Sequence, residues 1–194
     1  MSEINTVDAL GDDVAVGKLI DRSITEFVDN VMSTVGQYAF YKCNALTMVS
    51  FPAATSVGSR AFQYCQYLTS ASLPSATTLA DNVFNECTRL KNVDVASATS
   101  LKTNAFSTCS ELVRISLPAV ASIGEMVFRS CRALTTVILG NTSQVATLSN
   151  TNAFYMASNA IIYVPDALVD SYKSATNWST YADRIKPISE LPEE

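Results

Sequence analysis

The sequence contains no histidine among its 194 residues. Histidine is the usual general base near neutral pH, the usual partner of a nucleophilic serine or cysteine, and the commonest metal ligand. Its absence excludes most hydrolase arrangements, and we expect no catalytic residues. Tyr38 and Lys42 match a Tyr-x-x-x-Lys spacing, but no glycine-rich dinucleotide loop precedes them, so coincidence is the favoured interpretation.

Long apolar runs and basic runs are also missing. No apolar stretch reaches the ~18 residues that a membrane helix needs, so no membrane insertion is predicted. The net charge is −5 and Lys and Arg never cluster, so nucleic acid is not an expected partner. The first residues lack the basic start and apolar core of a secretory signal, and none is predicted.

The dominant feature of the sequence is a repeat. Five apolar columns recur every 22 residues without drift, and units of this kind must stack to bury their apolar faces. The first three columns are Phe40, Phe62, Phe84, Phe106 and Phe128; Cys43, Cys65, Cys87, Cys109 and Cys131; and Leu46, Leu68, Leu90, Leu112 and Leu134. The other two are Val49, Ala71, Val93, Ile115 and Val137, and Phe51, Leu73, Val95, Leu117 and Leu139.

The spacing within a unit predicts the conformation of each half. Apolar residues at i, i+1, i+4 and i+7, as in segment 39–46, indicate a short helical turn. The alternation from Val49 to Phe51 indicates a half-buried strand that ends at Pro52. We therefore predict an α/β leucine-rich-repeat solenoid, curved, with parallel strands on its concave side and short helical turns on its convex side.

The ends of the array deviate from the repeat. Residues 23–27 align at the same period with 45–49, which places the polar Asp29 where Phe51 lies, as expected for a terminal unit. The predicted organisation is a partly irregular N-terminal segment (1–17), a degenerate capping repeat (18–35), five repeats of about 22 residues (36–149), a C-terminal cap with the last strand and one or two helices (150–188), and a tail (189–194).

The C-terminal cap carries its own apolar pattern. A last strand is predicted over 161–164, followed by a helix that Asp166 caps. Two stripes of larger side chains are expected to close the open end of the core. They are Leu168, Val169 and Tyr172, and Trp178, Tyr181 and Ile185.

The five cysteines occur once per unit and not in Cys-x-x-Cys pairs, so no metal or other cofactor site is expected. Parallel side chains on adjacent turns hold their β-carbons farther apart than the ~3.8 Å that a disulfide prefers. The prediction is a column of five free, buried thiols.

The repeated motif resembles the BspA-like class of leucine-rich repeats. The resemblance rests on segment 58–68, Gly-Ser-Arg-Ala-Phe-Gln-Tyr-Cys-Gln-Tyr-Leu, and on segments 71–74, 162–165 and 177–182, and it covers about residues 18–188. It implies the solenoid fold. The class includes bacterial surface adhesins, proteins of anaerobic protists and phage products, and its longer adhesins carry a signal or anchor that this chain does not show.

A binding surface is predicted on the concave side, where outward strand positions form two columns. The columns are Met48, Ser70, Asn92, Arg114 and Thr136, and Ser50, Ser72, Asp94, Ser116 and Ile138. Arg114 and Asp94 are the strongest anchors. The alternatives are a merely solvated face, or recognition by the convex residues Tyr41, Tyr64, Tyr67 and Arg129, since aromatic and arginine side chains dominate binding energy at interfaces.

Two functions follow from this pattern. The first is a non-catalytic recognition or adhesion module at a cell surface, which binds a protein or a cell-surface glycan. The second is a structural virion protein, held by packing against phage capsid or tail proteins. Strand edges at the two ends would also favour self-association into a homo-oligomer if they were imperfectly covered.

Overall fold

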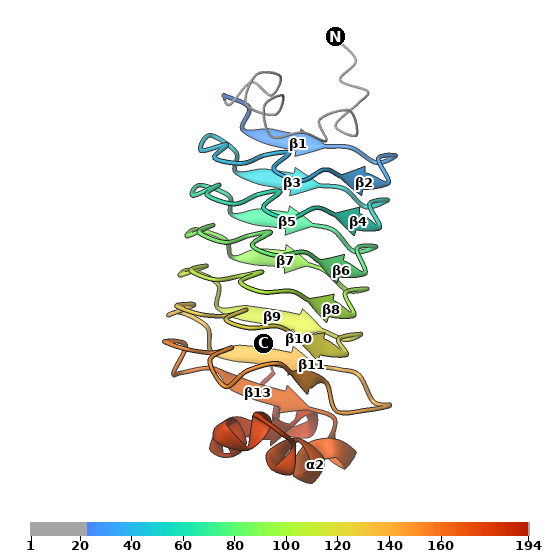
Figure 1. Ribbon diagram of the computed structural model, residues 1–194, viewed down its shortest axis with the longest axis vertical. Helices are drawn as coiled ribbons and strands as arrows, with labels where there is room; N and C mark the ends of the chain where they lie inside the picture. Colours follow the sequence, from blue (N-terminus) through green and yellow to red (C-terminus); the bar gives the residue numbers. More distant parts are fainter. Residues whose placement is uncertain (1–22, 194) are drawn as a thin grey trace.

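The computed structural model describes residues 23–193. Within this part, the chain winds into similar turns that stack along one long axis, and the helical C-terminal segment lies at one end (Figure 1). The predicted parallel-strand solenoid is confirmed. The predicted N-terminal segment 1–17, and residues 18–22 of the predicted capping repeat, lie outside the described residues.

One face of the stack, here called the strand face, is built from two four-stranded parallel sheets. The first contains β1 (Glu26–Val28), β3 (Met48–Ser50), β5 (Ser70–Ser72) and β7 (Asn92–Asp94). The second contains β9 (Arg114–Leu117), β11 (Thr136–Leu139), β13 (Ile161–Val164) and β14 (Ile185–Pro187). The strand predicted over 161–164 is β13.

A second ladder of two-residue strands lies beyond the bend that ends each strand of the strand face from β1 to β11, and the sequence analysis did not predict it. These strands form one continuous parallel sheet. They are β2 (Thr34–Val35), β4 (Ser56–Val57), β6 (Thr78–Leu79), β8 (Ser100–Leu101), β10 (Ser122–Ile123) and β12 (Thr147–Leu148). Each of these strands buries one apolar side chain, and an apolar pattern of two residues cannot be distinguished from a loop in the sequence.

The segments predicted as short helical turns are instead linked tight turns, here called the turn face. N–H groups alternate in direction: Phe40 N donates to Ala61 O of the next turn (2.7 Å), whereas Cys43 N donates to Phe40 O of its own turn (3.1 Å). An N–H bonded to the next turn cannot donate to a helical i−4 carbonyl. Left-handed φ angles of 54° to 63° recur at Tyr38, Arg60, Asn82, Asn104 and Met126, and at Lys42, Tyr64, Glu86, Thr108 and Ser130.

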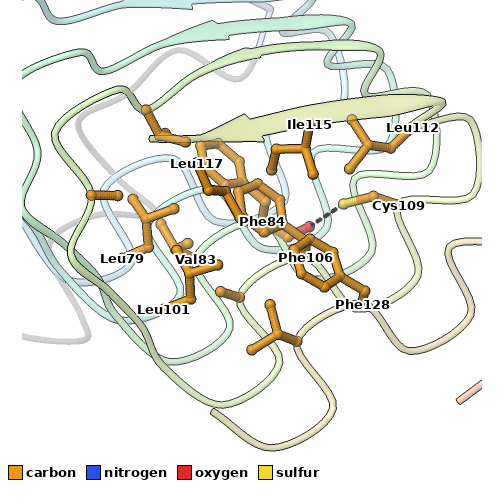
Figure 2. Close-up of a cluster of buried hydrophobic side chains, with 14 of the residues drawn as sticks. Leu79, Val83, Phe84, Leu101, Phe106, Cys109, Leu112, Ile115, Leu117 and Phe128 are labelled. Atoms are coloured by element: carbon orange, nitrogen blue, oxygen red, sulfur yellow. Dashed lines mark hydrogen bonds between the residues drawn. The ribbon is translucent and has the colours of Figure 1, made fainter. Parts of the chain in front are cut away.

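The phenylalanine column forms a stack of rings through the core. Phe84 lies between Phe62 and Phe106, with ring centroids 5.2 and 5.4 Å away and interplanar angles of 7° and 12°. Figure 2 shows Phe84, Phe106 and Phe128 in this stack beneath the strand face. Phe154 continues it at 5.2 Å from Phe128, although 26 residues separate the two in the chain. The predicted core column is therefore confirmed.

The five cysteines are buried, and none of them forms a disulfide. Four of the thiols donate a hydrogen bond to the phenylalanine carbonyl oxygen of the preceding turn, for example Cys109 Sγ to Phe84 O at 3.2 Å (Figure 2). The others are Cys65, Cys87 and Cys131. Burial raises the pKa of these four thiols, to about 12 for Cys131, because a thiolate loses its hydration in the core.

We expect no thiol to react with a thiol reagent in the folded protein near pH 8, and all five to react after unfolding without reductant. A count of one or three would contradict free thiols.

The four raised pKa values also predict that the free energy of unfolding falls above the ordinary thiol pKa of 9.0. The unfolded chain then releases protons that the folded chain retains, which costs up to about 1.4 kcal/mol per pH unit per thiol. Denaturant titrations from about pH 8 to about pH 11, which begin below that pKa and end above it, test this prediction.

The first described turn is a half repeat in the predicted register. Phe27 of β1 pairs with Val49, so Asp29 takes the place of Phe51. The Asp29 carboxylate accepts from the backbone N–H groups of Val31 (2.9 Å) and Met32 (2.7 Å). A polar residue here therefore closes a local turn where later repeats carry a core side chain.

The other end of the stack is capped by side chains that bond to the backbone of the last turn. Trp178 Nε1 donates to Ala146 O (2.6 Å), and Ala146 N donates to the Tyr172 hydroxyl (2.9 Å). Asn177 Nδ2 donates to Leu148 O (2.6 Å). These groups serve as partners because no further turn follows β12 in its ladder. Both predicted apolar stripes pack on the core.

The helical elements of the cap are short. They are η1 (Asp166–Leu168), α2 (Val169–Ser174), η2 (Trp178–Arg184) and η3 (Ile188–Glu190). The prediction that Asp166 caps the helix was wrong, because α2 begins at Val169 with no side-chain cap. Asp166 instead accepts from Ser189 N at 3.1 Å, and hydrogen bonding by the side chain and then the backbone of Ser189 lowers the pKa of its carboxyl.

Candidate functional site

The ten predicted binding residues all lie on strands of the strand face, two per strand, in β3, β5, β7, β9 and β11. Met48, Ser70 and Asn92 are in register, and so are Arg114 and Thr136. The second column divides in the same way between Asp94 and Ser116. The residues thus form columns within each sheet, but the columns are interrupted between β7 and β9.

This interruption is a break in the backbone ladder. Elsewhere on the strand face, Phe51 N donates to Ser72 O (2.9 Å) and Leu73 N donates to Asp94 O (2.8 Å). Among the described residues, the equivalent bond from Val95 N to the Ser116 carbonyl is absent, and β7 and β9 belong to different sheets.

The break is confined to the strand face. The second ladder continues across it, with Ser100 of β8 paired to Ser122 of β10. The turn-face bonds also continue, since Phe84 N donates to Ala105 O (2.9 Å) and Phe106 N to Val127 O (3.0 Å). The turns therefore remain stacked, while β7 and β9 do not pair with each other.

A change in one repeat column accompanies the break. The residue before each strand is a threonine in most turns, and its hydroxyl donates to the carbonyl of the preceding turn, as Thr69 Oγ1 does to Thr47 O (3.0 Å). The column carries Lys91 and Val113 on the two sides of the break. Neither side chain can repeat this bond with the same geometry. This irregularity is visible in the sequence, and the sequence analysis missed it.

A surface hollow of about 350 Å³ lies over the break. Six of the predicted residues line it: Ser70, Ser72, Asn92, Asp94, Arg114 and Ser116. Lys91 also lines it, and its ammonium lies 3.2 Å from the Glu111 carboxylate. Val93 at its base is only partly buried, whereas Ala71 and Ile115 in the same column are 2% exposed. Met48, Ser50, Thr136 and Ile138 lie on the strand face outside this lining.

The lining of the hollow is largely polar. Small serine side chains leave room for a ligand, and charged groups of both signs surround it. In residues 23–193 no cluster of three or more cysteine, aspartate or glutamate side chains is placed to hold a metal ion. No helix in the described part of the chain is long and apolar enough to cross a membrane.

The alternative residues on the turn face are dispersed. Tyr41 and Tyr64 touch each other, with ring centroids 5.7 Å apart, whereas Tyr67 stacks with Arg89 and Arg129 lines a separate hollow beside Tyr155. The Lys42 ammonium lies over the rings of Tyr41 and Tyr64, while the Tyr38 hydroxyl bonds to Arg60. Tyr38 and Lys42 therefore each contact other side chains of this face.

Solved structures of bacterial proteins share the fold. A leucine-rich repeat protein from Bacteroides ovatus is 22% identical with a TM-score of 0.68, over 85% of this chain and 42% of its own. A leucine rich cell surface protein from Faecalibacterium prausnitzii is 21% identical with a TM-score of 0.58, over 73% and 48%. The pneumococcal vaccine antigen PcpA is 14% identical with a TM-score of 0.66, over 84% and 40%. The chain spans less than half the length of each.

The sequence comparisons give the family. No curated protein is significantly similar to this chain. The profile of the BspA type leucine rich repeat region matches residues 33–161 in six copies. This match covers more than half of the sequence and includes both sides of the ladder break. The chain therefore belongs to the BspA-type leucine-rich-repeat family.

Proposed function

We propose that this chain is a non-catalytic recognition module that binds an extended segment of a partner protein at the hollow between β7 and β9. The observation that carries the proposal is the ladder break, where β7 and β9 do not pair with each other at a hollow lined by Asp94, Arg114 and Lys91. Peptide groups and charges of both signs are the features that a polypeptide can match, as in strand addition at a sheet edge.

The family relation supports this role. The Faecalibacterium relative is described as a cell surface protein, and we extend that location to this chain as part of the proposal. Repeat proteins use extended surfaces for binding because each turn adds contact area at a fixed orientation. The partner would then be an extracellular or host protein, and adhesion would be the outcome of binding.

The binding test starts from a library of displayed random peptides selected on the folded protein, with affinities measured by calorimetry. We expect the double substitution Asp94→Ala with Arg114→Ala to weaken the best peptide by about tenfold or more, since central charged anchors dominate such interfaces. Thermal unfolding checks that the double variant is folded. Unchanged affinity, or selective binding of neutral glycans instead of peptides at the hollow, would refute the proposal.

A nearly isosteric variant tests the ladder break itself. In Val113→Thr, we expect the new hydroxyl to donate to the Lys91 carbonyl, narrowing the hollow and raising the free energy of unfolding by about 0.5–1.5 kcal/mol. The same variant should bind the selected peptide more weakly. Val28→Thr is the matched control, because Val28 is 54% exposed and Val113 is 52% exposed. Tighter binding by Val113→Thr would contradict the role of the break.

A further inference from the structure

Three tyrosines and two cations form a contiguous group on the turn face of the first turns. This group, here called the tyrosine cluster, contains Tyr38, Tyr41, Lys42, Arg60 and Tyr64. The rings of Tyr38 and Tyr41 meet edge to face at 5.3 Å, and those of Tyr41 and Tyr64 at 5.7 Å. The cluster therefore forms a connected aromatic surface across adjacent turns.

The cations lie against these rings. Lys42 Nζ is 5.2 Å from the Tyr41 centroid and 5.6 Å from that of Tyr64, and the Arg60 guanidinium is 5.3 Å from the Tyr38 centroid. Both cationic side chains are exposed, and the tyrosines are half-buried. The cluster thus carries two positive charges in a chain whose net charge is −5, and the next turn carries the acidic residues Asp81 and Glu86.

We propose that the tyrosine cluster binds an anionic polysaccharide that carries carboxylates on its sugar rings. A tyrosine ring packs against the apolar C–H face of a sugar, while a cation beside that ring binds the carboxylate. Lys42 and Arg60 each provide such a pairing, on successive turns. Arg89, 4.3 Å from the Tyr67 centroid, provides a third pairing further along the solenoid.

A linear charged polymer matches this arrangement better than an acidic peptide. The three cations lie on successive turns of the solenoid, each against a tyrosine ring, and a polysaccharide presents a rigid ring and a carboxylate in each residue along its length. A glutamate side chain offers the carboxylate on a flexible stem, without a rigid apolar face to cover the tyrosines. The inference is independent of the hollow on the strand face, because the two sites share no residue.

Calorimetric titration of the intact protein with oligogalacturonate tests the proposal, with neutral malto-oligosaccharide and poly-glutamate as parallel ligands. We expect binding of oligogalacturonate alone, weakening as salt screens the charges. The double substitution Lys42→Gln with Arg60→Gln should weaken it by about tenfold or more. Tyr41→Leu should also weaken it, while Tyr41→Phe, which keeps the ring, should retain it.

The matched control is Arg132→Gln with Lys173→Gln, which removes two exposed cations that are not part of the cluster. This variant should bind like the unmodified protein. Equal loss in the control, equal binding of poly-glutamate, or no binding of oligogalacturonate at low salt would each overturn the proposal. Far-ultraviolet circular dichroism of every variant separates lost binding from lost folding.

Discussion

Phe84→Ala is expected to lower the free energy of unfolding by about 3–5 kcal/mol. Phe84 is fully buried and stacks on Phe62 and Phe106, so its removal creates a cavity and interrupts the ring stack from both sides. Each turn of a solenoid contacts only its neighbours, and a weak turn therefore separates the array into two parts. Urea denaturation and hydrogen exchange measure the effect, and we expect faster exchange on both sides of Phe84.

Tyr155→Ala is the control for this experiment. Tyr155 is 57% exposed, so removing its ring should change the free energy of unfolding by no more than about 0.5 kcal/mol. A similar loss in both variants would mean that ring size alone, and not the interior stack, determines stability.

Trp178→Ala is expected to destabilise the C-terminal turns by about 3–5 kcal/mol. Trp178 is fully buried, touches Tyr172 at a centroid distance of 5.2 Å, and donates to the Ala146 carbonyl. Its loss removes apolar contacts and leaves that carbonyl without its partner. Hydrogen exchange should accelerate at 147–148 and 161–164, while β3 and β5 keep most of their protection.

Trp178→Phe separates the two contributions. Phenylalanine keeps most of the buried ring but cannot donate to the Ala146 carbonyl. We therefore expect Trp178→Phe to lower the free energy of unfolding by about 1–2 kcal/mol, which is less than the decrease expected for Trp178→Ala. Uniform acceleration of exchange along the whole chain in Trp178→Ala would contradict a local capping role and would indicate that the solenoid unfolds as one unit.

The candidate site was predictable in its residues but not in its shape. The repeat period places Asp94 and Arg114 on one face, because alternate strand residues point outward. It places them in two continuous columns, whereas the structure interrupts both columns at the ladder break. The change from threonine to Lys91 and Val113 marks that break in the sequence, but its effect depends on a hydrogen bond between turns. Such a bond becomes visible only when the turns are stacked.

The sequence by itself determined the period, the core and the ends of the array. Phenylalanine and leucine recur every 22 residues. Stacked turns bring residues at the same repeat position together, so these residues contact one another in the core. Tertiary structure alone decided the conformation of the turn face, the second ladder, the break at β7 and β9, and the contact of Lys42 with two tyrosines. These features depend on where backbone N–H groups find partners in the neighbouring turn, and the spacing of apolar side chains does not specify those partners.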